Sequence, residues 1–198
     1  PEDRTPIYAL RDALTATSDR LIERVSSLVD LDGFHRFWAV ETMIGNLDSY
    51  AGNADRFFVY DDPERGIVFM PASTQVSLLT FSDFPASVYA QGELARRLYL
   101  IPVGRQSHLD SITSALEEVW NEDELEAEID RMNDLIAPRT HRDDYKDAVV
   151  ILRDFVASRR SAIEAELAIG GAAWPHEQRP TFCIVPRGSI EAVCTTSW

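Results

Sequence analysis

Residues 45–60 read GNLDSYAGNADRFFVY. The helix pattern that runs into this stretch is apolar on most sides, and the stretch ends in the strand-like run RFFVY. Gly45 and Asn46 supply a helix-ending signal, and Asp48 and Asn53 follow, five residues apart. The stretch therefore predicts a polar loop between a buried helix and a strand. Loops held between rigid elements are places where chemistry is often found.

The segments on either side of this loop have clear periodicities. On the N-terminal side, apolar residues at helical spacing predict one helix over residues 8–29, and Asp32 is the expected N-cap of a second helix that begins GFHRFWAVETM. On the C-terminal side, RFFVY and GIVFM are joined by DDPER, which predicts a β-hairpin. The acids of that turn lack EF-hand spacing and indicate a solvated turn.

The rest of the chain is predicted to be mostly helical. After a loop with a possible short strand over residues 76–80, we expect helices over residues 92–99, 106–120, 122–137 and 142–169. Asn121 is the expected cap of the third of these. The plan is α+β, a mostly helical lobe with a small β-hairpin. We expect residues 1–170 to form this lobe, and residues 171–198 to form a linker and the start of a β-rich C-terminal element.

Composition excludes several classes of function. The formal net charge of −14, with Lys146 as the single lysine, argues against a nucleic-acid-binding surface. The longest apolar runs are too short to cross a bilayer, so no transmembrane segment is expected. Since the chain starts at Pro1 without a signal-peptide pattern, we interpret it as a piece of a longer protein.

The two cysteines, Cys183 and Cys194, leave two interpretations open. They are either small apolar strand residues or, in an exported protein, the halves of a disulfide. A hairpin that turns at residues 187–188 would place Cys183 opposite Ala192, so that a bridge would need a longer turn or a bulge.

Most common catalytic and metal-binding patterns are missing from the sequence. No two histidines stand at metal-ligand spacing, and the sequence contains no G-x-S-x-G elbow, G-x-G-x-x-G or Walker A motif. Asp48 and Asn53 remain. Their spacing is that of a protein-kinase catalytic loop, in which the acid accepts the proton of the attacking hydroxyl and the asparagine ligates magnesium. Such a pair also satisfies backbone groups at many helix ends, so the spacing alone does not decide.

The wider segment FHRFWAVETMIGNLDSYAGNADRFFVYDDPERGIVFMP resembles the spore-coat-protein-H (CotH) kinase family. The resemblance continues through GELARRLYLIP and VWNEDELEAEIDRMNDLI and more weakly through GSIEAVCTTSW. It implies the helical C-lobe of an atypical protein-kinase-like fold, with the N-lobe outside this chain. It also implies ATP and Mg²⁺ as cofactors, serine phosphorylation of coat or cell-envelope proteins, and an extracytoplasmic (secreted, envelope or coat) location.

Carried over to this chain, the resemblance assigns Asp48 as the catalytic acid and Asn53 as the cofactor- and metal-binding asparagine. Asp55 and Arg56 stand where the family usually has further asparagines, and Gln75 stands where it usually has the magnesium-binding acid. Asp83 is the next acid downstream and the other candidate ligand.

A neutral amide oxygen is a poorer ligand for Mg²⁺ than a carboxylate. We therefore expect an ATP-dependent protein kinase whose catalysis is impaired. The alternatives are an inactive pseudokinase that serves as a binding or scaffolding module, and an unrelated helical domain that binds a partner through its acidic helices.

Overall fold

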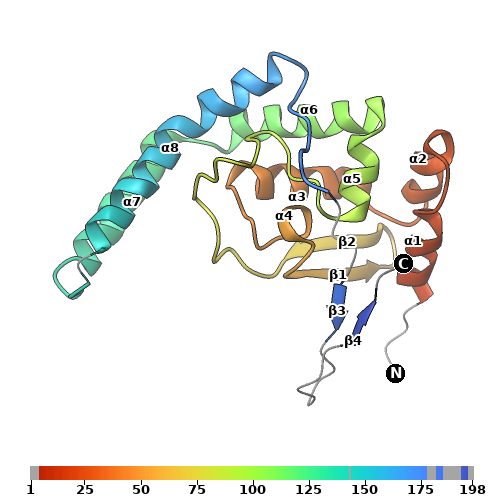
Figure 1. The fold of residues 1–198 in the computed structure, drawn as a ribbon, viewed down its shortest axis with the longest axis horizontal. Helices are drawn as coiled ribbons and strands as arrows, with labels where there is room; N and C mark the ends of the chain where they lie inside the picture. Colours follow the sequence, from red (N-terminus) through yellow and green to blue (C-terminus); the bar gives the residue numbers. More distant parts are fainter. Residues whose placement is uncertain (1–4, 143, 178–181, 185–192, 196–198) are drawn as a thin grey trace.

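The computed structural model describes residues 5–142, 144–177, 182–184 and 193–195 (Figure 1). In chain order the described elements are α1 (Thr5–Ala13), α2 (Ser18–Ser26), α3 (Leu31–Met43), α4 (Tyr50–Asn53), β1 (Phe57–Asp62), β2 (Gly66–Pro71), α5 (Glu93–Tyr99), α6 (Pro102–Glu118), α7 (Glu122–Ile136), α8 (Tyr145–Leu167), β3 (Phe182–Ile184) and β4 (Val193–Thr195). The predicted α+β class, mostly helical with a small hairpin, is confirmed.

Helix α3 lies at the centre of the molecule, between α6 on one side and β2 on the other (Figure 1). Its Trp38 is fully buried, stacks on the imidazole of His108 at 3.7 Å between ring centroids, and donates its indole N–H to the Tyr89 carbonyl at 2.6 Å. Phe34 packs edge-on against Phe69 of β2 at 4.9 Å. Contacts on both sides fix the end of α3, and so the point at which the loop after it begins.

The N-terminal prediction of a single helix over residues 8–29 is wrong. The structure has two helices, α1 and α2, because Thr17 is extended (φ −64°, ψ 157°) and precedes a new helix at Ser18. Apolar residues at helical spacing are buried from both helices, which is why periodicity alone indicated one. The predicted cap Asp32 is also wrong, since the carboxylate of Asp30 accepts a hydrogen bond from the Gly33 amide at 2.9 Å.

The β-hairpin is confirmed. β1 pairs antiparallel with β2, from Phe57 opposite Pro71 to Asp62 opposite Gly66. The Asp62 carboxylate accepts the backbone N–H groups of Glu64 and Arg65, both at 3.0 Å, which lowers the pKa of Asp62 and stabilises the turn.

Helices α5 to α8 follow the predicted order. α6 begins at Pro102, earlier than expected, because proline suits the first position of a helix. The Asn121 side chain caps α7 by accepting the Glu124 amide at 3.3 Å, as predicted. The short strand expected over residues 76–80 is absent from the described strands, because this segment makes single hydrogen bonds to the end of α3 instead of a ladder.

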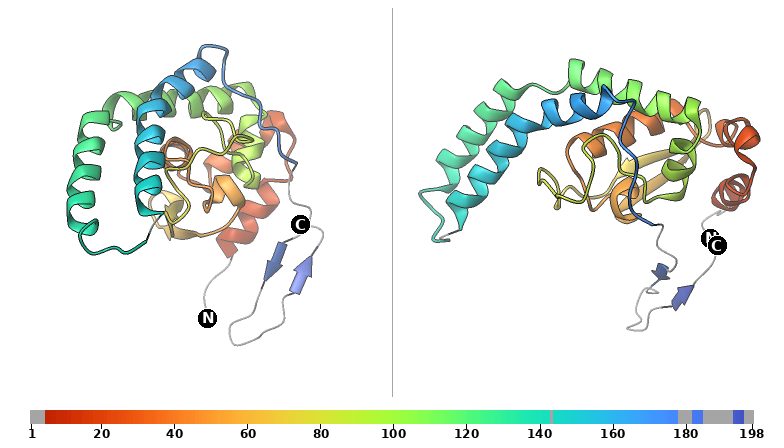
Figure 2. Two further views of the ribbon diagram at one scale, coloured as in Figure 1. Left: turned by 60° about the vertical axis from the view of Figure 1, so that its left-hand side comes forward. Right: turned by 45° about the horizontal axis from the view of Figure 1, so that its top comes forward.

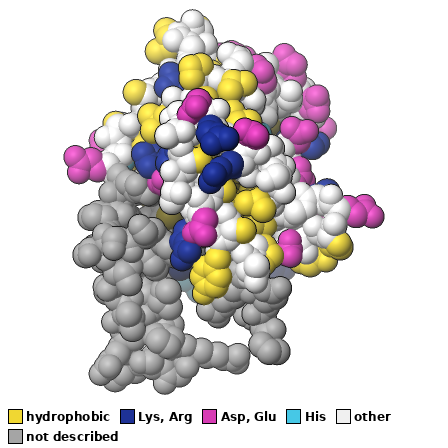
Figure 3. All heavy atoms as spheres, turned by 90° about the vertical axis from the view of Figure 1, so that its right-hand side faces the viewer, with side chains coloured by type: hydrophobic (Ala, Val, Ile, Leu, Met, Phe, Trp, Pro, Cys, Tyr) yellow, Lys and Arg dark blue, Asp and Glu magenta, His cyan; other side chains and the backbone are white. Residues whose placement is uncertain are grey.

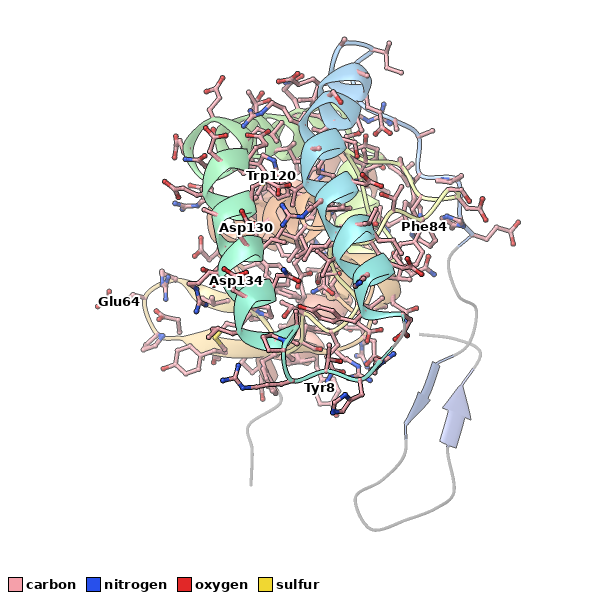
Figure 4. All side chains as sticks on the ribbon, turned by 90° about the vertical axis from the view of Figure 1, so that its left-hand side faces the viewer. Tyr8, Glu64, Phe84, Trp120, Asp130 and Asp134 are labelled. Carbon is pink, nitrogen blue, oxygen red and sulfur yellow. The ribbon has the colours of Figure 1, made fainter. Side chains whose placement is uncertain are left out.

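Helices α7 and α8 form an antiparallel arm that extends away from the rest of the lobe (Figures 1 and 2). In Figure 4 they lie side by side with Asp130 on α7 facing α8, where Arg153 pairs with both Asp130 and Glu126. Arg160 pairs with Glu122 at 2.7 Å nearer the body. These pairs line the seam between the two helices, so part of the acidic run on α7 serves the arm itself.

The C-terminal strands pair with Cys183 opposite Cys194. This corrects the expected register, in which Cys183 faced Ala192, since Phe182 pairs with Thr195 and Ile184 with Val193 on either side of the cysteines. Among the described helices, none has the length and hydropathy that crossing a bilayer requires. On the face shown in Figure 3, acidic, basic and apolar side chains are interspersed over the coloured surface.

Candidate functional site

The loop after α3 is held against the segment that follows β2. Leu47 donates its amide to the Val76 carbonyl at 2.9 Å, and Leu78 donates its amide to the Ile44 carbonyl at 2.7 Å. The Asn46 side chain donates to the Ser73 carbonyl at 2.8 Å. Two segments about thirty residues apart in sequence are therefore side by side, and they carry Asp48 and Gln75 respectively.

Arg56 joins these two residues. Its Nε lies 3.3 Å from Oδ2 of Asp48, and its Nη1 donates to Oε1 of Gln75 at 3.0 Å. The chain reaches this position through left-handed backbone at Ala54 (φ 55°) and Arg56 (φ 45°), and the Arg56 carbonyl accepts the Ala72 amide at 3.2 Å. Asp48 is the more enclosed partner, with 19% of its side chain exposed against 48% for Arg56. The site thus has a guanidinium between the predicted acid and the predicted ligand position.

Asn53 ends the short helix α4. The Ser49 hydroxyl oxygen caps this helix by accepting the Gly52 amide at 2.9 Å, and the Ser49 carbonyl accepts the Asn53 amide at 3.0 Å. The Tyr50 hydroxyl accepts the Leu94 amide at 2.8 Å and so ties α4 to α5. Asn53 is half-buried and has a defined position.

A pocket of about 300 Å³ lies beside Asn53. It is lined by Leu47, Gly52, Asn53, Phe84, Gln91, Trp174, His176 and Glu177. The rings of Phe84, Trp174 and His176 form one wall, with centroid separations from 4.4 to 5.6 Å, and Figure 4 shows Phe84 near the segment that follows α8. This segment is anchored by Gln91, which donates to the Glu177 carbonyl at 3.3 Å.

Asp83 lies on the loop that leads into the pocket wall. It is exposed, its carboxylate accepts the Ser82 hydroxyl at 3.1 Å, and its carbonyl lies 2.9 Å from Nε2 of His176. Among the contacts of the described residues, none joins its carboxylate to Asp48 or Gln75. The structure therefore brings Asp48 and Gln75 together through Arg56, with Asn53 lining the adjacent pocket, and associates Asp83 with His176.

An acid that sequence reasoning missed lies beneath the loop. Glu41 is 3% exposed on α3, and burial raises its pKa to about 8, an effect that the nearby Ser49 hydroxyl only partly offsets. Neither carboxylate oxygen has a hydrogen-bond partner of normal geometry among the described residues. At neutral pH this acid is predominantly protonated. Only its place on a helix with apolar residues on several sides could have indicated its burial from sequence.

The residues present do not fit a magnesium ion. A hard dication needs oxygen ligands, preferably carboxylates, whereas Asp48 is ion-paired and Asn53 and Gln75 offer only amide oxygens. In the described part of the chain, His, Cys, Asp and Glu side chains form no group of three or more that could hold a metal ion. The Arg56 guanidinium also brings a positive charge into contact with both Asp48 and Gln75.

Arg56 is the site residue whose role the sequence did not reveal. It is the only lysine or arginine between Arg36 and Arg65, flanked by acids on the loop, and this isolation was the available signal. Its pairing depends on two left-handed residues and on contact between distant segments, and neither is readable from local pattern.

Comparison with known proteins adds one match. The family model described as CotH kinase protein matches residues 1–164, which include the loop, the hairpin, the segment with Gln75 and most of α8. The match ends before residues 171–177, which supply Trp174 and His176 to the pocket wall. A search of curated proteins finds no match.

Proposed function

The chain belongs to the CotH kinase protein family, and on this premise we propose that it is a kinase-like protein in which ATP- and magnesium-dependent phosphotransfer is severely impaired. In this proposal Asp48 occupies the place of the catalytic acid and Asn53 that of the metal-binding asparagine. Residues 1–170 correspond to the helical lobe of the kinase-like fold.

The observation that carries the proposal is the neutral side chain at position 75. The segment with Gln75 is hydrogen-bonded alongside the loop with Asp48, so its side chain is the one available where a second metal-binding acid is needed. Phosphoryl transfer depends on cations that neutralise the charge developing on the phosphates. A site with one paired carboxylate and two amides supplies little of that stabilisation.

A second candidate function is an inactive pseudokinase that acts as a binding or scaffolding module. The observation that favours it is the ion pair between Asp48 and Arg56, because the guanidinium lies against the carboxylate that would have to accept the proton of a substrate hydroxyl. For either function we propose a protein partner of a spore coat or cell envelope, in keeping with the family, and an extracytoplasmic location.

The test compares phosphotransfer and ATP binding by the full-length protein with those of two variants. Transfer from ATP to dephosphorylated casein, and to the protein itself, is measured with and without Mg²⁺ for the wild type, Asp48→Asn and Asp83→Asn. We expect transfer close to background in all three. Robust magnesium-dependent transfer that Asp48→Asn abolishes and Asp83→Asn leaves intact would overturn the proposal. ATP binding with wild-type transfer that cannot be distinguished from that of Asp48→Asn would select the pseudokinase alternative, whereas weak wild-type transfer that Asp48→Asn removes would support an impaired kinase.

A further inference from the structure

We propose that the guanidinium of Arg56 takes the place of a divalent cation between Asp48 and Gln75, so that the site excludes Mg²⁺ and Arg56 and Gln75 act as one unit. The inference rests on the proposed assignment of the loop with Asp48 to a kinase-like site. It goes further, because it identifies a positive residue that keeps the cation out, in addition to the acid that is missing.

Two nitrogen atoms of the Arg56 guanidinium contact the two side chains that a cation would otherwise join. Nε faces the carboxylate of Asp48 at 3.3 Å, and Nη1 faces the amide oxygen of Gln75 at 3.0 Å. One oxygen of each of the two side chains is therefore already in contact with a positive group. The nearby carboxylate of Asp55 accepts the Arg56 amide through Oδ1 at 2.8 Å, on the backbone side of Arg56.

The positive charge of Arg56 opposes the binding of Mg²⁺ between Asp48 and Gln75. Arginine stays protonated at every pH at which a protein is folded, so its positive charge cannot be removed to admit a metal ion. A dication within a few ångströms of the guanidinium would be repelled by it while sharing the single carboxylate of Asp48. A side chain held by its own backbone is also always present, unlike a metal ion drawn from solution.

The contact between Arg56 and Gln75 predicts that neither residue alone restores a metal site. In Gln75→Asp the new carboxylate would pair with Arg56, because a guanidinium bridges two carboxylates readily. In Arg56→Asn the exclusion is lifted, but one carboxylate remains beside two amides and binds a hard cation weakly. Only the double variant presents two unpaired carboxylates and amide oxygens at the same place.

A double-variant cycle tests this directly. Binding of Mn²⁺ alone is measured from the loss of its free EPR signal, with Mg²⁺ competition, for the full-length wild type, Arg56→Asn, Gln75→Asp and the double variant. We expect the wild type and the two single variants to bind Mn²⁺ weakly, and the double variant to bind it at least about tenfold more tightly than any of them. Two substitutions that acted independently would not show this coupling. Arg65→Asn, which removes the hairpin arginine paired with Asp62, is the matched control and should leave binding unchanged.

Besides an additive cycle, two binding results would overturn the inference. One is tight Mn²⁺ binding by the wild type. The other is binding by Gln75→Asp that equals that of the double variant, which would mean that Arg56 does not exclude the ion. If the double variant does not fold, as judged by circular dichroism and thermal melting, the wild type still provides a test: Mn²⁺ should leave the NMR signal of the Arg56 side-chain Nε–H unbroadened, and broadening of this signal at millimolar Mn²⁺ contradicts the inference.

The result is separable from that of the proposed function. Magnesium-dependent phosphotransfer by the wild type would remove the proposed function, and with it this inference. An additive cycle combined with an inactive wild type would remove the inference alone, leaving impairment by the missing acid as its explanation.

Discussion

The guanidinium of Arg159 on α8 donates a hydrogen bond of 2.8 Å to the carbonyl oxygen of Met43, the last residue of α3. The same side chain donates to the carbonyls of Thr42 and Ala86 and is almost fully buried. Burial lowers its pKa, and the loss of solvation is offset by these three acceptors. Arg159 therefore ties the base of the α7–α8 arm to the point where the functional loop begins.

Replacement of this arginine by methionine should be strongly destabilising. Arg159→Met keeps much of the side-chain volume but removes the guanidinium from three buried carbonyls, of which that of Thr42 keeps the Gly45 amide as a donor. We expect a loss of about 3–5 kcal/mol in the free energy of unfolding. Chemical denaturation followed by circular dichroism measures it. Arg131→Met, which removes an exposed pair with Glu128, is the control and should leave the free energy of unfolding essentially unchanged. A loss below about 1 kcal/mol for Arg159→Met would contradict a stabilising role for these hydrogen bonds of Arg159.

The buried acid Glu41 should make stability depend on pH. Its pKa is about 8 in the folded protein against an ordinary value of 4.5, so the folded state holds the proton more tightly than the unfolded chain. The contribution of Glu41 to the free energy of unfolding is fully favourable below pH 4.5. It is lost as the pH rises toward 8, and above pH 8 it stays at its minimum. Glu41→Gln should therefore raise stability by an amount that grows with pH, on the order of a few kcal/mol at pH 8.

The measurement is a set of urea unfolding curves from pH 5 to pH 9 for the wild type, Glu41→Gln and the exposed control Glu118→Gln. The difference between Glu41→Gln and the wild type isolates this group from the other titrations. A constant difference across the range would show that Glu41 titrates normally.

The sequence was sufficient for the α+β plan, for the β-hairpin and for the loop with Asp48, because each depends on local periodicity and turn residues. The break between α1 and α2 was missed because the apolar spacing continues across it. The pairing of Arg56 with Asp48 and Gln75 was missed for a different reason, since it requires long-range hydrogen bonds and left-handed residues that tertiary structure imposes.

The left-handed backbone in the loop yields a prediction about Ala54. This residue has φ 55° and is the C-cap that follows α4, a position where alanine is disfavoured and glycine is not. Ala54→Gly should stabilise the folded protein by up to about 1 kcal/mol, because relief of this strain outweighs the added freedom of the unfolded chain. Thermal melting measures the effect, with Ala127→Gly inside α7 as a control that should be destabilising by about 1 kcal/mol. If Ala54→Gly is also destabilising to this extent, the conformation is not strained.

Gly52 is predicted to be the least replaceable residue of the loop. A Cβ atom at this position would lie 2.6 Å from the carbonyl oxygens of both Asn46 and Leu47, and both are backbone atoms that cannot move aside as a side chain would. Gly52→Ala should therefore displace α4 with Asn53 and lower the free energy of unfolding by about 1–3 kcal/mol. The Asn53 side-chain NH₂ signals should shift in NMR spectra, while the indole N–H of Trp120, which packs against Phe155 of α8, should not. If Gly52→Ala has the stability of the wild type and leaves the Asn53 signals unchanged, the loop can accommodate a Cβ atom at this position. The close packing of α4 against the end of α3 would then be wrong.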